Sequence, residues 1–341
     1  MLQVIRSEAE MITSIRFQNF KALRDVTLPL GRFTLIVGPN GSGKSTAMQA
    51  FQFVLDETPK SLKDWSTHGT LQNSVKVHVT WLEDGTEYVT GAVLKSASSF
   101  IEYPSEADSV GFYAGKLRNY LKSFRMFSFD ASAIAGAVDT SPNPQLGEDG
   151  SNLAAVLDAL RDTHPERFEA LNKELNRWLP EFDRILFETP DKGRKSFLVR
   201  TSVGHHRLRA SALSQGVLFA LAFLALAYLP EPPSIVCFEE PDRGIHPRLL
   251  VDIRDAMYRL AFPENYGEER EPVQVIATTH SPYLLDLYKE HPEQIVIAHK
   301  NEDGVQFERL SEKPHLNEIL EGAPLGDIWY SGILGGVPSA P

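Results

Sequence analysis

The sequence predicts an α/β fold with a mostly parallel core sheet, an antiparallel β lobe and a helical lobe. Three apolar runs, residues 33–37, 234–238 and 273–278, have the length and composition of buried strands and alternate with helical stretches. Buried strands that alternate with helices imply a parallel sheet. Earlier in the chain, paired segments alternate apolar with polar residues, which is typical of antiparallel strands.

Composition bounds the class of protein. The 341 residues are enough for one large α/β domain or two ordinary ones, and 42% hydrophobic with 23% charged residues is typical of a soluble globular protein. The net charge of −11 argues against a surface built for indiscriminate nucleic-acid binding. The single cysteine, Cys237, excludes an intramolecular disulfide and a multi-cysteine zinc site. Residues 1–10 lack the apolar core of a signal peptide, so we expect a cytoplasmic protein.

The N-terminal part of the chain is expected to form strands around one helix. Residues 11–30 alternate apolar and polar side chains around residues 19–21, which predicts two strands joined by a turn. A helix is expected over residues 47–55, after the strand at 33–37. Residues 74–82 and 87–94 alternate again, and the turn-forming residues 83–85 between them predict an antiparallel pair.

The middle of the chain combines helices with one hairpin. Residues 139–150 are rich in Pro, Gly, Asn and Asp and are the best candidate for an exposed linker. Asp149 or Ser151 is placed to cap the helix that follows, and Pro165 to open the next one. The apolar run 217–230 is too short to span a bilayer and predicts a buried helix. The full set of expected elements is a helix at 112–124, a strand at 125–129, helices at 152–161 and 165–179, a hairpin of 185–188 with 196–200, and a helix at 247–260.

The loop after the first buried strand matches the phosphate-cradling pattern G-x-x-x-x-G-K-[ST]. In such a loop the glycines let successive N–H groups point at an anion, and the following helix presents its positive end to the phosphates. Lys44 is expected to reach the β- and γ-phosphates, and the Ser45 hydroxyl to bind Mg²⁺. The alternative is a glycine-rich turn that binds nothing. The predicted nucleotide-binding residues are Gly38, Pro39, Asn40, Gly41, Ser42, Gly43, Lys44, Ser45 and Thr46.

Two further buried strands end in side chains suited to phosphate chemistry. The strand at 234–238 leads into Glu239 and Glu240, of which Glu239 can hold Mg²⁺ and Glu240 can orient or deprotonate the attacking water. The alternative is two solvated acids. The strand at 273–278 leads to His280, whose imidazole can donate to the γ-phosphate, although a lone histidine is more often structural. Ser214 and Gly216 open the buried helix and form either an anion site or an ordinary cap.

A basic stretch runs from Lys192, in the turn of the hairpin, to Arg209, shortly before the buried helix. It holds Lys192, Arg194, Lys195, Arg200, Arg207 and Arg209, with no acidic residue between Lys192 and Pro230. This clustering indicates a nucleic-acid face, a partner surface or a solvated hairpin, and the sequence leaves these three open.

The order of these segments resembles the ABC-type ATPase heads of the RecF/SMC/OLD-like branch, including the small predicted AAA-type ATPases of bacteria. That resemblance covers nearly the whole chain and implies a P-loop NTPase fold. We expect one domain over residues 1–341, with an N-terminal half at 11–130, a helical lobe at 151–230, a second core half at 231–300 and a tail at 301–341. The matching motifs are residues 19–21, 38–41, 213–216, 238–241, 244–247, 279–282 and 325–332.

The resemblance implies a homodimer that closes on ATP. ATP at the phosphate loop of one subunit would be completed by Ser214, Gln215 and Gly216 of the other, and Asp242 would lie in the loop that crosses the interface. His280 would be the switch histidine. Residues 213–217 lack the family's first glycine and its terminal polar residue, a departure that concerns the contacts across the interface. Glu239 stands where an aspartate is usual and gives a longer arm to the magnesium, so we expect slow hydrolysis. The family's coupling glutamine is not placed, and Phe20 is a weak candidate for stacking on adenine.

The distances between the motifs along the chain narrow the choice of relatives within this branch. About 170 residues separate the loop from residues 213–216, which fits neither transporter ATPase subunits nor SMC heads with an inserted coiled coil. About 60 residues follow His280, fewer than the nuclease domain of OLD-type proteins needs. We therefore expect a Mg²⁺-dependent ATPase that controls a separate nuclease-like effector or a DNA transaction, as in phage defence or DNA repair. The alternative is a RecF-like, nucleotide-regulated DNA-binding module.

Overall fold

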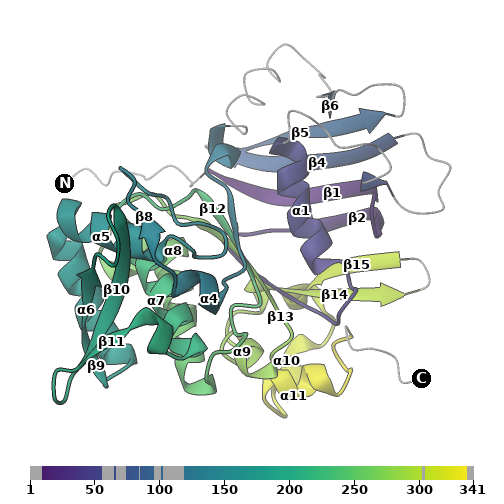
Figure 1. The fold of residues 1–341 in the computed structure, drawn as a ribbon. Helices are drawn as coiled ribbons and strands as arrows, with labels where there is room; N and C mark the ends of the chain where they lie inside the picture. The colour runs from purple at the N-terminus through teal and green to yellow at the C-terminus, as the bar shows by residue number, and fades with distance from the viewer. Residues whose placement is uncertain are drawn as a thin grey trace, which may run out of the picture. The chain divides into compact units, whose positions relative to one another are not determined.

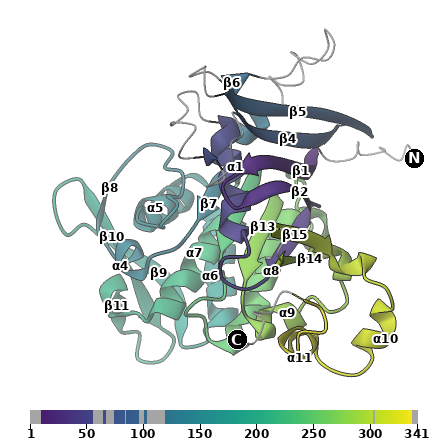
Figure 2. The same ribbon diagram turned by 90° about the vertical axis from the view of Figure 1, so that its right-hand side faces the viewer.

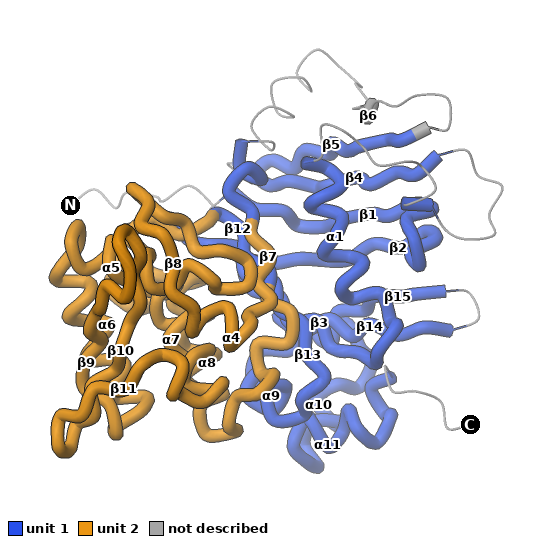
Figure 3. Tube along the Cα trace, in the orientation of Figure 1, with its two compact units in different colours: residues 1–124, 234–237, 271–341 blue, residues 125–233, 238–270 orange. Residues whose placement is uncertain are grey.

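The computed structural model describes residues 10–55, 65–66, 74–83, 85–95, 101–102, 119–301 and 304–335. The chain forms two compact units (Figure 3). Unit 1 comprises residues 1–124, 234–237 and 271–341, and unit 2 comprises residues 125–233 and 238–270. These units cut the chain differently from the expected lobes, since the segment 231–300 contributes to both.

Unit 1 contains an antiparallel sheet in the strand order β2-β1-β4-β5-β6 (Figure 1). In β4 every second residue is buried, as expected for a strand with one face on the core. The turn between β1 and β2 lies at residues 21–22, close to its predicted place, while residue 84 of the other predicted turn is outside the described residues. The two predicted strand pairs are confirmed. The strands are β1 (Met11–Phe20), β2 (Leu23–Pro29), β4 (Ser74–Glu83), β5 (Thr86–Lys95) and β6 (Ile101–Glu102).

Unit 1 also holds a core sheet in the strand order β15-β14-β3-β13-β12, in which β12 is Ile235–Glu239 and contributes its residues 235–237 to this unit. Strands β3 (Phe33–Val37) and β13 (Gln274–Thr279) are buried along their whole length and pair in parallel. On the other side of β3, β14 (Ile295–Asn301) is also parallel, and β15 (Gly304–Arg309) closes the edge antiparallel to β14. The mostly parallel core is therefore confirmed. Strands β14 and β15 were not predicted.

Helices of unit 1 lie next to both sheets. Helix α1 (Lys44–Leu55) starts three residues earlier than predicted and packs Phe53 against the ring of Phe20. Near the C-terminus, α9 (Pro282–Asp286), α10 (Leu316–Leu320) and α11 (Leu325–Tyr330) form a small helical group (Figure 2). Of the helix predicted at 112–124, residues 119–122 are helical and residues 112–118 lie outside the described residues.

Unit 2 is built around α7 (Gln215–Tyr228), in which every residue from Val217 onward is buried. A helix that is apolar on all sides must be surrounded by other elements, and α4, α5, α6 and α8 all pack on it. Beside them, β9, β10 and β11 form antiparallel pairs, and β8 pairs with β10. The bounds are β7 (Arg125–Phe127), α4 (Ala131–Ile134), β8 (Val138–Asp139), α5 (Leu153–Thr163), α6 (Pro165–Trp178), β9 (Phe182–Glu188), β10 (Arg194–Thr201), β11 (Arg207–Arg209) and α8 (Leu250–Ala261).

Two local predictions in unit 2 need correction. Neither Asp149 nor Ser151 caps α5: its N-cap is Asn152, whose side chain instead accepts from Gly147 N and donates to Gln145 O. The segment 139–150 is mostly exposed, as predicted, but it is no linker between units: it begins in β8 and stays within unit 2, where Ser128 N donates to Glu148 O. The Asn152 side chain thus bonds to the loop before α5, and a backbone bond over 20 residues ties that loop to the strand region at Ser128.

Near the end of unit 2, the buried carboxylate of Glu268 forms an ion cluster with three arginines. Glu268, 8% exposed at its side chain, accepts from Arg259 at 2.6 Å and from Arg270 at 2.7 Å, and Arg167 lies 3.7 Å away. Burial lowers the pKa of Arg270, partly offset by the neighbouring carboxylate. One buried carboxylate therefore compensates several guanidinium groups. No helix in the described part of the chain is long and apolar enough to cross a membrane.

Candidate functional site

The loop between β3 and α1 in unit 1 has the backbone that a phosphate site requires. Gly41 and Gly43 adopt positive φ angles of 78° and 88°, which L-residues with a Cβ rarely take. A Cβ on Gly38 would stand 2.2 Å from the carbonyl oxygen of Ala298 in β14. A Cβ on Gly43 would meet Leu23 at 2.9 Å and Val305 at 3.1 Å. The loop is thus clamped between β2, β14 and β15, and only glycine fits at two of its positions.

Polar groups of the loop converge on its interior. Lys44 is only 6% exposed, and its Nζ donates to Gly38 O at 2.8 Å and Pro39 O at 2.9 Å. The Oγ of Ser42 is buried without a hydrogen-bond partner among the described residues. Helix α1 begins at Lys44 and has no acidic residue in its first turn, so nothing there opposes an anion at its positive end. Ser45, in the same turn, is exposed.

His280 emerges beside this loop. Strands β3 and β13 are parallel and in register, with Thr279 opposite Val37, so His280 and Gly38 are the next residues at the same edge of the sheet. The chain then turns sharply: Ser281 N donates to Thr279 Oγ1 at 2.9 Å, and the Ser281 hydroxyl caps α9 by accepting from Leu284 N. The carboxyl ends of parallel strands are where such folds bind ligands. The structure therefore brings His280 and the phosphate loop together within unit 1.

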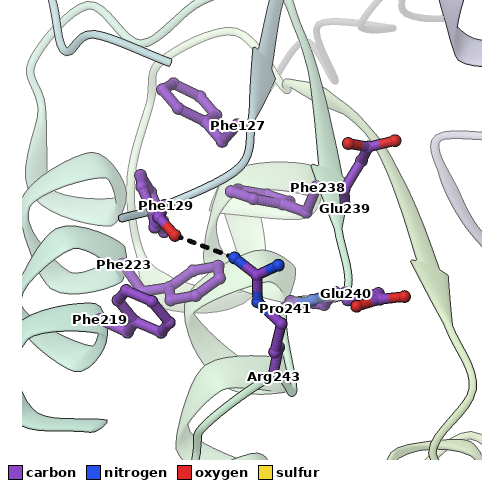
Figure 4. Close-up of a pocket in the computed structure, with 9 residues that line it drawn as sticks. All are labelled: Phe127, Phe129, Phe219, Phe223, Phe238, Glu239, Glu240, Pro241 and Arg243. Carbon is purple, nitrogen blue, oxygen red and sulfur yellow. Dashed lines mark hydrogen bonds between the residues drawn. The ribbon is translucent and has the colours of Figure 1, made fainter. Parts of the chain in front are cut away.

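Glu239 and Glu240 lie in unit 2, where they line a small pocket together with several phenylalanine rings. Glu239 ends β12, and Glu240 follows it with a positive φ of 48°, a strained conformation for a residue with a side chain. In Figure 4 both carboxylates point away from the phenylalanine rings, and the Arg243 guanidinium donates to Phe129 O at 3.3 Å. The rest of the lining is Phe127, Phe219, Phe223, Phe238 and Pro241.

The loop after the acids contacts the start of α7. Arg243 N donates to Glu240 O and Ile245 N to Asp242 O, which makes a tight double turn. Gly244 has φ +72°, and a Cβ there would stand 2.7 Å from the Gln215 side chain. A Cβ on Gly216 would lie 3.2 Å from Gly244 O. Thus the segments 214–216 and 240–244, predicted separately, form one surface of unit 2.

Ser214 performs the structural role that the sequence left open. Its side chain accepts from Val217 N at 3.4 Å and caps α7. Ser214 and Gln215 are nevertheless exposed, and the first turn of α7 carries no acidic residue. An ordinary cap and an anion site are therefore compatible here.

Most of the basic stretch is paired with carboxylates inside unit 2. Arg200 donates twice to Asp183 at 2.8 Å, and this guanidinium holds the pKa of Asp183 below its usual value. The other pairs are Lys195 with Asp158 at 3.3 Å, Arg209 with Glu188 at 3.2 Å and Arg194 with Asp191 at 3.8 Å. Their acids come from β9, α5 and the turn before β10, so the acid-free stretch of sequence is neutralised by its neighbours in space. Lys192 and Arg207 of the same set are exposed.

Phe20, the weak candidate for stacking on adenine, is excluded by its burial. Phe20 has no exposed surface, because its ring stacks on Trp65 at 5.4 Å and meets Phe53 at 5.5 Å. It cannot stack on adenine without breaking this cluster. Ala298 and Val305, which shape the loop, were not predicted; the apolar start of β14 is a local signal for Ala298 only.

The phosphate loop fits a nucleoside triphosphate with its metal. The evidence is the space closed to any Cβ at Gly38 and Gly43, the unsatisfied Ser42 hydroxyl and the buried Lys44. Backbone N–H groups and an ammonium bind phosphate oxygens, and a neighbouring hydroxyl such as that of Ser45 is an oxygen ligand suited to Mg²⁺.

Two solved structures with a similar fold are SMC heads. The crystal structure of the SmcHead bound to the C-winged helix domain of ScpA matches 87% of this chain and 96% of its own, at 16% identity and a TM-score of 0.57. The SMC head domain from Thermotoga maritima matches 87% of this chain and 98% of its own, at 18% identity and a TM-score of 0.52. At these identities the likeness shows the fold alone: an α/β SMC head.

Curated relatives match over shorter stretches. The OLD nuclease of Thermus scotoductus is 44% identical over 55 residues, which are 16% of this chain and 10% of the nuclease. Structural maintenance of chromosomes protein 1B of Mus musculus is 32% identical over 114 residues, 30% of this chain and 9% of that protein. The matches thus span about a tenth of these relatives.

A family model covers most of the chain. Residues 33–286, from β3 and the phosphate loop through the acidic pair to α9, match the model described as "AAA domain, putative AbiEii toxin, Type IV TA system". The chain therefore belongs to this AAA-domain family.

Proposed function

We propose that this protein hydrolyses ATP with Mg²⁺ and closes on the nucleotide as a homodimer, and that closure controls a separate effector or a DNA transaction. The observation that carries the proposal is the contact between segments 214–216 and 240–244 in unit 2, where Ser214, Gln215, Arg243 and Gly244 are exposed. A helix N-terminus free of acids beside a tight loop suits phosphate recognition. In a sandwich dimer it would serve the nucleotide of the other subunit.

Each group of the site has a role that its chemistry allows. Lys44 and the amides of residues 38–46 would bind the β- and γ-phosphates, and Ser45 and Glu239 would hold the metal. Glu240 would orient or deprotonate the attacking water, and its strained backbone fits a conformation kept for function. His280 would donate to the γ-phosphate from the edge of the core sheet. The bound metal would neutralise the charge that develops on the phosphate oxygens.

Across the dimer, Ser214, Gln215, Gly216 and Asp242 would complete the site. Gln215 lies against Gly244, so a change in the loop after the acids would be felt at the start of α7. Through this contact, hydrolysis at the acidic pair would change how tightly the start of α7 binds the nucleotide of the partner subunit. The effector is proposed to be nuclease-like, with a role in phage defence or DNA repair, because one curated relative is a nuclease and others are chromosome-maintenance proteins.

The test separates binding, closure and hydrolysis. In Glu240→Gln we expect ATP binding to persist, turnover to fall about 10²- to 10⁴-fold, and an ATP-dependent dimer to accumulate in sedimentation. Lys44→Ala should bind no ATP and stay monomeric, and Glu231→Gln, an exposed acid elsewhere, should behave as wild type. If Glu240→Gln binds ATP but never dimerises, the sandwich is wrong; if it hydrolyses ATP normally, Glu240 is not the base.

A further inference from the structure

The C-terminal helices of unit 1 expose large apolar side chains. Tyr283 on α9 is 63% exposed, Tyr330 at the end of α11 is 77% exposed, and Ile333 just after it is 63% exposed. None of them has a role in the nucleotide site. With Asp327 they are called the α9–α11 patch. Clustered exposed aromatic residues are typical of protein-binding surfaces rather than of free solvent-facing helices.

Close backbone contacts make this patch one surface. A Cβ on Gly326 would stand 2.5 Å from Pro282 O, and Gly326 N donates to Asp286 Oδ1 at 2.7 Å. Helices α9 and α11 therefore lie directly side by side (Figure 2). Tyr283 follows Pro282 at this contact, and Tyr330 lies one helical turn, about 6 Å, beyond Gly326. The two tyrosines thus flank the same junction.

The segment that carries α10 and α11 is negatively charged, and one cation lies against it: Lys289 Nζ donates to Ala323 O at 3.1 Å. Residues 316–335 contain Glu318, Glu321 and Asp327 but no lysine or arginine. All three carboxylates belong to exposed residues. Asp327 precedes Tyr330 by three residues on α11, so the two side chains are neighbours on the helix surface. A carboxylate beside an aromatic ring can bind a guanidinium in two ways. The carboxylate accepts a charge-assisted hydrogen bond, and the electron-rich face of the ring attracts the positive charge.

We propose that the α9–α11 patch binds an arginine-bearing segment of a partner protein. Tyrosine and isoleucine would cover its apolar stems, while Asp327 and the ring faces would take its guanidinium groups. The same negative charge disfavours a nucleic acid, and it disfavours a second copy of the patch, because like charges would meet. The proposal does not depend on ATP hydrolysis. The proposed partner would contact α9, which begins two residues after His280.

A selection from random peptides tests the chemistry of the partner. Short random peptides displayed on phage are panned on the nucleotide-free protein, with counter-selection on Tyr283→Ala/Tyr330→Ala. We expect the enriched peptides to carry arginine. In fluorescence anisotropy the double variant should bind the best peptide about tenfold more weakly, and Asp327→Asn should also bind it more weakly. Tyr266→Ala, which removes a tyrosine 38% exposed in unit 2, should bind it as wild type does.

Four outcomes would overturn the proposal: no enrichment, enriched peptides without a cationic residue, equal binding to the double variant, or a dimer in sedimentation that Tyr283→Ala/Tyr330→Ala converts to a monomer. The last would show that a second copy covers the patch. Because every measurement is made without nucleotide, these results do not depend on whether the proposed ATPase cycle is correct.

Discussion

Replacing Gly43 by alanine tests whether packing against the sheets shapes the phosphate loop. Two costs add at this position. A left-handed backbone costs an L-residue about 1–2 kcal/mol, and φ here is 88°. The new Cβ would also meet Leu23 at 2.9 Å and Val305 at 3.1 Å, and both side chains are buried; such overpacking costs about 1–3 kcal/mol. The expected loss of unfolding free energy is therefore about 2–5 kcal/mol.

Gly41→Ala is the matched control. Its φ is 78°, but nothing lies within 4 Å of the new Cβ, so only the backbone cost of about 1–2 kcal/mol remains. Gly193→Ala, with φ 79° and open space in unit 2, should cost the same without touching the loop. Urea unfolding followed by circular dichroism gives the three losses, and calorimetric titration gives ATP affinity.

We expect Gly43→Ala to lose more unfolding free energy than either control. We also expect partial rescue when Val305→Ala is added, because the atom that lies 3.1 Å from the new Cβ is then removed. Equal losses at Gly43 and Gly41, or no rescue, would show that the contacts with Leu23 and Val305 do not hold the loop. The nucleotide site would then depend on local backbone preference alone.

Three further predictions concern unit 2. Glu268→Gln should lower the unfolding free energy, measured in urea, by about 3 kcal/mol, because it leaves buried guanidinium groups without a carboxylate. Asp25→Asn, which breaks an exposed ion pair, should lower it by less than about 1 kcal/mol. Similar losses in the two variants would refute the buried cluster. The lowered pKa of Asp183 means that its contribution to stability is present above about pH 4 and is lost as the pH falls through the folded-state value. Carboxyl NMR titration should show that pKa rising in Arg200→Gln, and no change would exclude the ion pair. Ser214→Ala should lower the unfolding free energy by about 1 kcal/mol through its lost cap and should weaken ATP-dependent dimerisation; a stability loss with normal dimerisation would leave Ser214 as a cap only.

Local patterns were enough for much of this fold. The loop at 38–46, the strand before it and the buried helix α7 are each specified within a window of neighbouring residues. Apolar side chains in an unbroken run need burial on all sides, and a G-x-x-x-x-G-K sequence has few uses other than phosphate binding. For the same reason the hairpin of β9 and β10 appeared where its turn residues predicted it.

Tertiary structure decided what depends on residues far apart in the chain. The sequence showed a basic stretch without acids, but the fold brings Asp158 and Asp183 to Lys195 and Arg200. It showed a serine at a helix start and, separately, a loop after two acids, but only packing places Gln215 against Gly244. Phe20, exposed to no solvent, was excluded from stacking only by its aromatic neighbours. Periodicity and turn chemistry act over a few residues, whereas charge compensation and close backbone approach depend on distances in space that only the folded chain sets.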